Sequence, residues 1–228
     1  QQMLREMFAD FAAQEIAPLA EQIDHDEAIP DGLLRKMAQQ GFLATLIPEE
    51  QDGVGLDPLS YCLFLKEIGR ADFSVALLLS THNGLGIKTI LDYGTEAQQE
   101  TYLPPMALGE MIGAFALTEP AAGSDLQALT TRAELAPDGG HYLLNGSKTW
   151  VSNGDRAGLF ILFARTNRGI SAFLLERNTP GLQVGYREKT MGLRGLACHT
   201  LYLDDCRLTA GQLLGQEGQG LAIVKQAA

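Results

Sequence analysis

Cysteine is scarce in this sequence, and the few cysteines that occur lie far apart. Cys62, Cys198 and Cys206 are odd in number among 228 residues, and they lack the spacing of metal ligands. A disulfide framework is therefore excluded, and no metal site is expected. A reducing, cytoplasmic compartment is the default prediction for such a chain.

Long apolar runs and clusters of basic residues are also missing. No stretch of about eighteen apolar residues occurs, and residues 1–24 are charged and amphipathic rather than a signal peptide, so we expect no membrane span. Lysine and arginine number 17 against 28 aspartates and glutamates, which gives a net charge of −11. Because such a surface repels nucleic acid, nucleic acid is not an expected partner.

The first half of the chain has helical periodicity, with turn-forming residues between the periodic stretches. The predicted helices cover residues 2–22, 31–41, 59–70, 74–92 and 95–109. Pro104 and Pro105 are expected to kink or restart the last of them. His82 and Asn83 interrupt an apolar helix, and polar residues in that position are more often hydrogen-bonded core groups than catalysts.

From residue 113 the spacing of apolar residues changes from the helical period to the period of two that is typical of strands. The predicted strands cover residues 113–118, 128–135, 141–144, 149–152, 159–164, 171–176 and 200–204. Tight hairpin turns are expected at 138–140 and at Asn145-Gly146. Strands this short and this close together predict an antiparallel sandwich or barrel rather than a parallel sheet with crossover helices.

The fold class is therefore α+β, with an N-terminal helical bundle at 1–111 and a β-domain at 112–214. Residues 215–228 read as the start of a further helical domain, because Leu221, Ile223 and Val224 begin a new amphipathic pattern near the end of the sequence. We expect this pattern to be cut off by the chain end and its apolar face to lack a partner.

Two polar motifs stand at the ends of predicted strands. The first, at residues 115–125, reads FALTEPAAGSD, and the second, at 145–154, reads NGSKTWVSNG. Backbone amides in the first turn suit an anionic or carbonyl-rich ligand. Trp150, the only tryptophan, lies beside Ser152 and makes a flat apolar wall with a polar rim, which suits a planar heteroaromatic cofactor. The residues alone leave a second reading open, a core tryptophan next to a hairpin.

These motifs resemble those of the acyl-CoA dehydrogenase family. Two further segments, EKTMGLRG at 188–195 and LYLDDCRL at 201–208, are also similar to signatures of that family and occur in the same order. The resemblance implies a helical N-terminal domain, a central β-domain and a C-terminal helical domain. It also implies FAD as cofactor and an acyl-CoA thioester as substrate.

Residue roles follow from the resemblance where the motifs match. The residues expected at the cofactor are Phe115, Leu117, Thr118, Gly123, Ser124, Trp150, Val151 and Ser152. Ser124 and Arg168 are expected on the acyl-CoA side. The Thr118 hydroxyl would bond the pyrimidine end of the flavin, and Trp150 would pack against the ring.

The glutamate that removes the α-proton in this family lies in the C-terminal domain, and no match to it occurs here, so the chain alone is expected to be inactive. The resemblance further implies an electron-transfer flavoprotein or similar acceptor, and a homotetramer or dimer. A relative with altered chemistry stays an alternative: a flavin oxidase, a monooxygenase, a desaturase linked to an acyl-carrier protein, or a scaffold without turnover.

Overall fold

The helical part of the protein begins with a long, interrupted helix. In the computed structural model, which describes residues 1–227, α1 (Gln2–Phe11) runs through a π-turn at Ala12–Ile16 and a 3-10 turn at Ala17–Leu19 into α2 (Ala20–Asp26). Pro18 occupies the start of the 3-10 turn, where its missing N–H removes a helical hydrogen bond. The single helix predicted over 2–22 is therefore correct in place, but it changes type in the middle and extends to Asp26.

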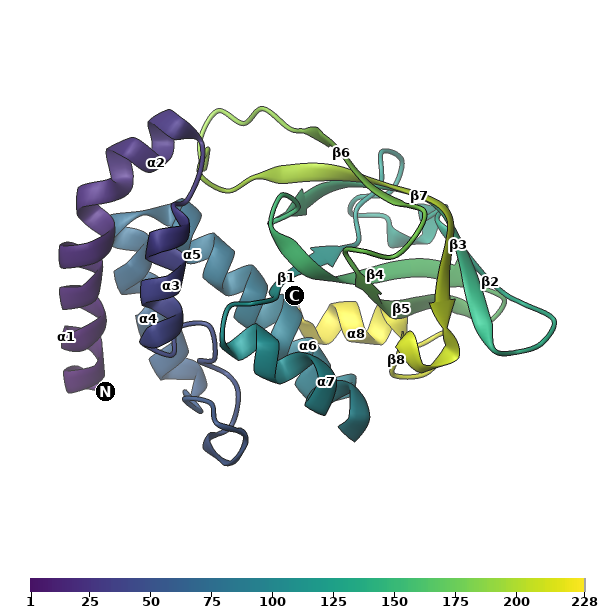
Figure 1. The fold of residues 1–228 in the computed structure, drawn as a ribbon, viewed down its shortest axis with the longest axis horizontal. Coiled ribbons are helices and arrows are strands. Elements are labelled where there is room, and N and C mark those ends of the chain that lie inside the picture. The colour runs from purple at the N-terminus through teal and green to yellow at the C-terminus, as the bar shows by residue number, and fades with distance from the viewer. Residues whose placement is uncertain (228) are drawn as a thin grey trace.

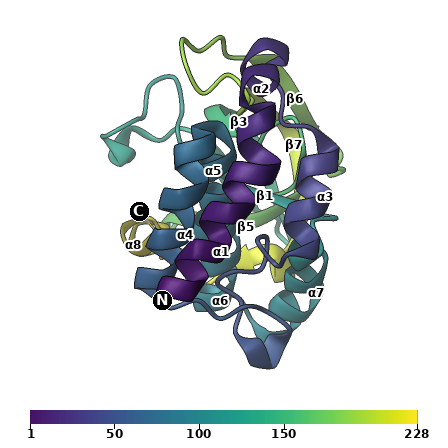
Figure 2. The same ribbon diagram turned by 90° about the vertical axis from the view of Figure 1, so that its left-hand side faces the viewer.

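The other helices pack behind this one, and α1 lies against α4 (Figures 1 and 2). They are α3 (Asp31–Gln39), α4 (Pro58–Ala71), α5 (Phe73–Ser80), a π-helical segment (Thr81–Ile87), α6 (Lys88–Tyr93) and α7 (Glu96–Ala107). The expected restart at Pro104 and Pro105 is wrong, because α7 continues through both. Pro104 is exposed, so a carbonyl group left without a helical donor can bond to water instead.

The second part of the molecule is one mixed, eight-stranded sheet with the order β6-β7-β3-β2-β4-β5-β8, and β1 pairs with β4 off this path. The strands are β1 (Ile112–Ala116), β2 (Arg132–Leu135), β3 (His141–Ser152), β4 (Ala157–Thr166), β5 (Gly169–Glu176), β6 (Leu182–Arg187), β7 (Cys198–Thr209) and β8 (Leu213–Leu214). The helical part followed by a sheet confirms the predicted fold class. A purely antiparallel sheet was wrong, since β1 and β2 both run parallel to β4.

The hairpin predicted at Asn145-Gly146 is also wrong, because β3 is one continuous strand with a register shift between Leu144 and Gly146. Gly146 has φ of +146°, and a Cβ there would lie 2.7 Å from Thr131 Oγ1 and 2.8 Å from Thr131 Cα. The glycine therefore serves the close approach of residue 131 rather than a turn. The hairpin at 138–140 is confirmed, since β2 and β3 pair antiparallel across it.

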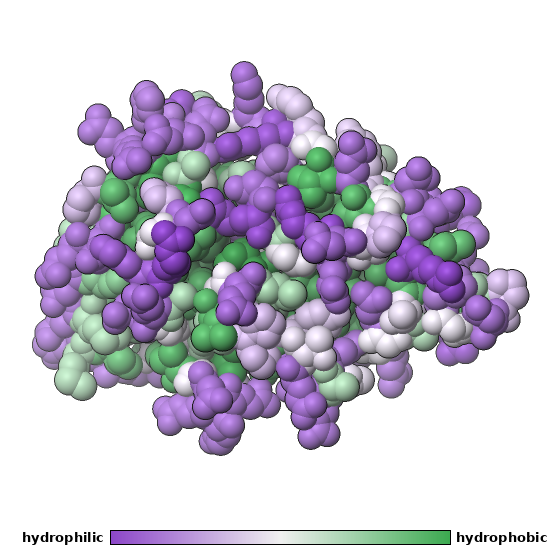
Figure 3. Space-filling model, viewed as in Figure 1, coloured by the Kyte–Doolittle hydropathy of each residue, from purple (hydrophilic) through white to green (hydrophobic). Residues whose placement is uncertain are grey.

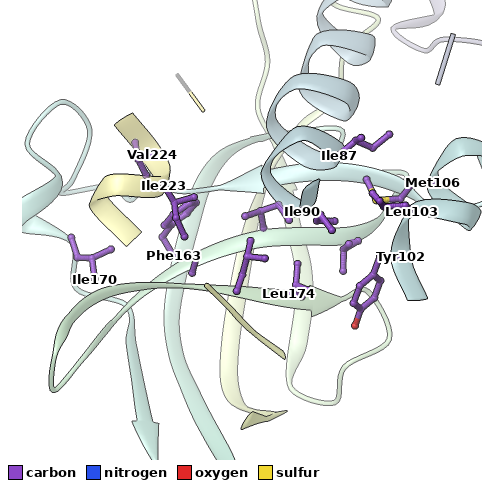
Figure 4. Packing of buried hydrophobic residues seen from close by; sticks show 14 of the residues in the cluster. Ile87, Ile90, Tyr102, Leu103, Met106, Phe163, Ile170, Leu174, Ile223 and Val224 are labelled. Atoms are coloured by element: carbon purple, nitrogen blue, oxygen red, sulfur yellow. The ribbon is translucent and has the colours of Figure 1, made fainter. Parts of the chain in front are cut away.

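Two apolar layers lie on opposite faces of β4 and β5. One layer lies inside the curved sheet, where Phe160 and Phe173 pack with Leu144 and Leu201 of β3 and β7. The other lies between the sheet and helices α6, α7 and α8 (Gly220–Ala227), as Figure 4 shows. The sheet therefore packs one apolar layer on its inner face and another between its outer face and the helices.

The last helix contradicts one expectation from the sequence. Ile223 and Val224 of α8 are buried and pack in the same layer as Phe163 and Ile170 of the sheet (Figure 4). The amphipathic pattern near the chain end therefore has a partner within the described chain. The prediction of an uncovered apolar face at 221–224 was wrong, because it treated the helix as if only a further helix could cover it.

Hydrophilic side chains predominate on the face shown in Figure 3, with hydrophobic ones scattered among them. Among the described residues, no helix is both long and apolar enough to cross a lipid bilayer.

Candidate functional site

The two polar motifs meet in the structure although about thirty residues separate them. The amide of Thr149 donates a hydrogen bond of 2.9 Å to the carbonyl of Thr118. One residue earlier on each strand, Lys148 Nζ donates to the carbonyl of Leu117 at 3.1 Å. The chain beyond β1 therefore lies directly beside β3, which places Thr118 next to the Trp150 segment.

A buried ion pair joins the motifs beneath this contact. Lys148 Nζ lies 2.7 Å from Glu119 Oε1, and their side chains are 0% and 2% exposed. The other carboxylate oxygen, Oε2, accepts hydrogen bonds of 2.7 Å from both the amide and the hydroxyl of Thr130, and Oε1 accepts one of 3.0 Å from the amide of Thr131. The Glu119 carboxylate at one end of the 119–131 loop thus binds the residues at its other end.

Charge and hydrogen bonding decide the ionisation of this pair. Burial alone would raise the pKa of Glu119, but the hydrogen bonds from Lys148, Thr131 and Thr130 outweigh it and lower the pKa to about 2. Burial lowers the pKa of Lys148, and the bond to Glu119 opposes that shift. Both residues lie within the motifs at 115–125 and 145–154, and neither was predicted to have a role. The sequence feature that could have indicated this ion pair is a Glu and a Lys at the ends of two apolar stretches.

The turn after Glu119 presents the expected backbone donors. The amide and carbonyl of Glu119 bond reciprocally with those of Ala122, at 2.9 and 3.1 Å, around Pro120 and Ala121. Gly123 and Ser124 follow, both exposed, and within residues 1–227 their amides donate to no protein acceptor. These amides can therefore donate hydrogen bonds to an anionic or carbonyl oxygen of a ligand.

Trp150 is not a core residue, so that reading of the sequence was wrong. The residue is 51% exposed and has φ of +57°, a left-handed conformation that a bulky side chain adopts at a cost. It lies where the pairing of β3 with β7 shifts register between Lys148 and Val151. At this irregularity the indole faces outward. The Val151 side chain packs inside the sheet, so only the backbone of Val151 could contact a ligand.

Ser152 lies at the end of the same strand, beside Cys198 of β7. Its hydroxyl is 3.7 Å from Cys198 Sγ. Nearby, the Glu188 carboxylate accepts from the hydroxyls of Thr149 and Thr200, each at 3.4 Å. Of the segment between β6 and β7, Glu188 thus lies beside Thr149 of the site, whereas Arg194 pairs with Asp24 of α2.

Phe115 of β1 and Leu117, directly after it, pack against the layer between the sheet and the helices. Both are partly buried, and the Phe115 ring lies 4.9 Å from that of Phe163. They form an apolar surface next to Thr118, with alternate residues Ala114 and Ala116 buried inside the sheet.

His82 fixes β1 to the helical part. The amide of Gly113 donates to His82 Nδ1 at 3.0 Å, and Nε2 donates to the carbonyl of Leu43 at 3.1 Å. Asn83 bonds to the backbone of Phe42, Leu79 and Thr45 in the same way. The prediction that both residues are hydrogen-bonded core groups is therefore confirmed.

Arg168 is placed less favourably for its expected role. It lies in the turn between β4 and β5 with a side chain that is 77% exposed, and its guanidinium is 3.5 Å from Glu217. This ion pair directs its charge toward the segment before α8. The structure therefore shows no contact between Arg168 and the Thr118 or Trp150 segments.

These residues fit a planar aromatic cofactor with an anionic portion. The half-exposed indole offers a flat surface, Thr118 and Ser152 offer hydroxyls, and the amides of Gly123 and Ser124 offer donors without partners. All lie on segments that bond to one another at Thr118 and Thr149 or adjoin that bond. The donor set is neutral and lies on segments that are bonded to one another, so it can bind and orient a cofactor.

Family models match most of the chain. One described as "Acyl-CoA dehydrogenase, N-terminal domain" matches residues 1–110, and another described as "Acyl-CoA dehydrogenase, middle domain" matches residues 114–206. Every motif at the site therefore lies inside a matched region or within two residues of its end.

Similar proteins agree with these matches. An acyl-CoA dehydrogenase of Bacillus subtilis is 42% identical over 98% of this chain, and the short-chain specific acyl-CoA dehydrogenase of mouse mitochondria is 40% identical over 99%. A solved structure of an acyl-CoA dehydrogenase complexed with FAD from Bacillus anthracis superposes with a TM-score of 0.92 and 35% identity, covering 99% of this chain and 39% of that one. The chain spans 60% of the length of the Bacillus subtilis relative and 55% of the mouse relative.

Proposed function

The chain belongs to the acyl-CoA dehydrogenase family, and we propose that it forms the helical and β-sheet part of an FAD-dependent dehydrogenase acting on an acyl-CoA thioester. The observation that carries this proposal is the junction of the two motifs. There Thr118, the free amides of Gly123 and Ser124, and the exposed indole of Trp150 are held together by the Thr118–Thr149 bond.

The reaction removes two hydrogens from the substrate, a proton from the α-carbon and a hydride from the β-carbon, and leaves a double bond between these carbons. FAD, when bound, supplies the acceptor for the hydride. When FAD is bound, the Thr118 hydroxyl would donate a hydrogen bond to the ring, Trp150 would cover one side of it, and the amides of Gly123 and Ser124 would bind the pyrophosphate or the acyl-CoA. The Ser152 hydroxyl would donate a further hydrogen bond at the ring.

The proton of the α-carbon needs a carboxylate base, and Glu119 and Glu188, the carboxylates that bond to other segments of the site, are already engaged. Glu119 is paired with Lys148 and accepts bonds from Thr130 and Thr131. Glu188 accepts bonds from Thr149 and Thr200. We therefore assign the base to a segment that lies outside these 228 residues and corresponds to the part of the relatives that the chain does not span.

The substrate class is an acyl-CoA, with Ser124 and Arg168 on the side of the CoA. The name of the mouse relative makes a short acyl chain the first to test. The expected electron acceptor is an electron-transfer flavoprotein or a similar carrier, and the active form is a homotetramer or dimer in the cytoplasm.

The test uses two proteins: the 228-residue chain, and the same chain joined to the part of the Bacillus subtilis relative that follows the matched region. Each is saturated with FAD, and dye reduction is measured with butyryl-CoA, octanoyl-CoA and palmitoyl-CoA. We expect the joined protein to retain FAD and to form the enoyl-CoA and reduced dye in equal amounts.

The chain alone is expected to show no turnover. If it turned over at the rate of the joined protein, the base would lie within residues 1–228, and Glu188→Gln would then identify or exclude Glu188. If dye reduction were absent from both proteins while oxygen was consumed with acyl-CoA, the chemistry would be that of an oxidase. FAD absent from both proteins after dialysis would contradict the proposal.

A further inference from the structure

Three separate segments of the site are bonded to the same pair of buried charges. Residues 117–118 are bonded through the Leu117 carbonyl to Lys148, and residues 130–131 are bonded through their amides to Glu119. Lys148 is part of β3, directly before Thr149 and Trp150. No other ion pair described in residues 1–227 has both side chains as fully buried as this one.

Stability alone is a weak explanation for such a pair. Removing two charges from water costs about as much as their attraction returns, and apolar residues of similar volume often serve a protein's stability as well or better. Apolar contacts, however, have no direction. The carboxylate and ammonium instead fix donor and acceptor positions through five hydrogen bonds of 2.7 to 3.1 Å.

We propose that Glu119 and Lys148 are positioning residues for the candidate site: together they set where Thr118 and the 120–125 turn lie relative to Trp150. The inference rests on the proposed function for what the site binds, but the positioning itself is a property of the protein without ligand. Neither residue touches the reacting atoms in this proposal.

The geometry explains why an apolar replacement should displace the loop rather than simply loosen the core. Without the carboxylate, the amides of Thr130 and Thr131 lose their acceptors, and Thr130 is already exposed. The loop can recover these bonds by moving toward water. Such a movement pulls both ends of the 119–131 loop away from β3 and thereby weakens the hydrogen bond between Thr118 and Thr149.

The test compares Glu119→Met/Lys148→Met, which keeps side-chain volume, with Glu119→Gln, which keeps shape and removes one charge. Hydrogen exchange is measured at the amides of Thr131 and Thr149. Fluorescence of Trp150 reports the same site, because it is the only tryptophan. All three readouts work on the chain without FAD. The matched control is Glu67→Gln, which breaks the ion pair of Glu67 with Arg5 in the helical part.

We expect exchange at Thr131 and Thr149 to be at least about tenfold faster in the double variant, and Trp150 emission to change, while circular dichroism stays native. Glu67→Gln is expected to lower the melting temperature and to leave these amides and Trp150 unchanged. In the joined protein described above, the double variant should bind FAD at least about tenfold more weakly.

Native exchange at both amides and native emission in a folded double variant would overturn the inference. If the double variant does not fold, Glu119→Gln decides by the same readouts. A wild-type joined protein without FAD would count against the proposed function, and the exchange and fluorescence results would still judge the role of the pair.

Discussion

Acidification offers a direct test of how β1 is held, because His82 must stay neutral in the folded protein. Its Nδ1 accepts from Gly113 and its Nε2 donates to Leu43, so no ring nitrogen is left for a second proton without losing the bond to β1. The ring is fully buried, and burial lowers the pKa of His82 to about 4 from its ordinary value of 6.5.

The sign follows from proton binding. Between pH 6.5 and 4 the unfolded chain takes up a proton at this histidine and the folded chain does not, so the contribution is complete above pH 6.5 and is lost as the pH falls toward 4. The difference between the two pKa values corresponds to about 3 kcal/mol in the free energy of unfolding.

Urea unfolding at pH 7, 6, 5 and 4.5 measures this loss. The control is His82→Gln, whose amide oxygen and nitrogen can accept from Gly113 and donate to Leu43 without titrating. The free energy of unfolding of the wild type should fall by about 2 kcal/mol more than that of His82→Gln between pH 7 and 4.5. Because all other groups are shared, equal slopes in the two proteins would refute the assignment of a neutral, bonded His82.

Three further outcomes are expected. Trp150→Ala in the joined protein should weaken FAD retention by about 0.5–1.5 kcal/mol or more, measured by absorbance after dialysis, and unchanged retention would remove Trp150 from the site. Trp150→Gly should lose FAD similarly, but its free energy of unfolding should be about 1 kcal/mol higher than that of Trp150→Ala, since glycine adopts positive φ without strain. Equal urea midpoints of the two variants would contradict the strain at this position. Gly146→Ala should lower the free energy of unfolding, measured with urea, by about 2–4 kcal/mol because the new Cβ meets Thr131. Gly113→Ala should lower it less, because the nearest atom to its new Cβ is the flexible end of Met106. The reverse order would contradict the packing described.

Much of the fold could be predicted because periodicity in the sequence reports which face of an element is buried. The helical run 74–92 and the strands at 159–164 and 171–176 were found in this way and correspond to elements of the structure. The Asn145-Gly146 pair was misread because the same two residues serve a hairpin or a bulge. What decides between them is Thr131 on a neighbouring strand, and a local pattern does not contain that contact.

The site could be predicted only as motifs. The sequence singled out Thr118, Gly123, Ser124 and Trp150, but it could not show that Trp150 faces outward, since that depends on the register shift against β7. The Glu119–Lys148 pair was missed because each residue reads locally as a polar strand end. Its meaning arises from the meeting of two segments about thirty residues apart.

The parallel pairing of β1 with β4 has a consequence for the order of events during synthesis. At 5–20 residues per second, roughly 2.5–10 seconds pass between completion of β1 at Ala116 and completion of its partner β4 at Thr166. Throughout that interval β1 has no complete sheet to join, and its unpaired edge, with Phe115 and Leu117, is open to other chains. The helical part, which includes His82, has been synthesised by then and can bind Gly113 once it folds. In the nascent protein, one end of β1 can therefore bind the helical part while the other end still lacks its partner strand. Slow translation between residues 116 and 157 prolongs the period in which this strand can aggregate.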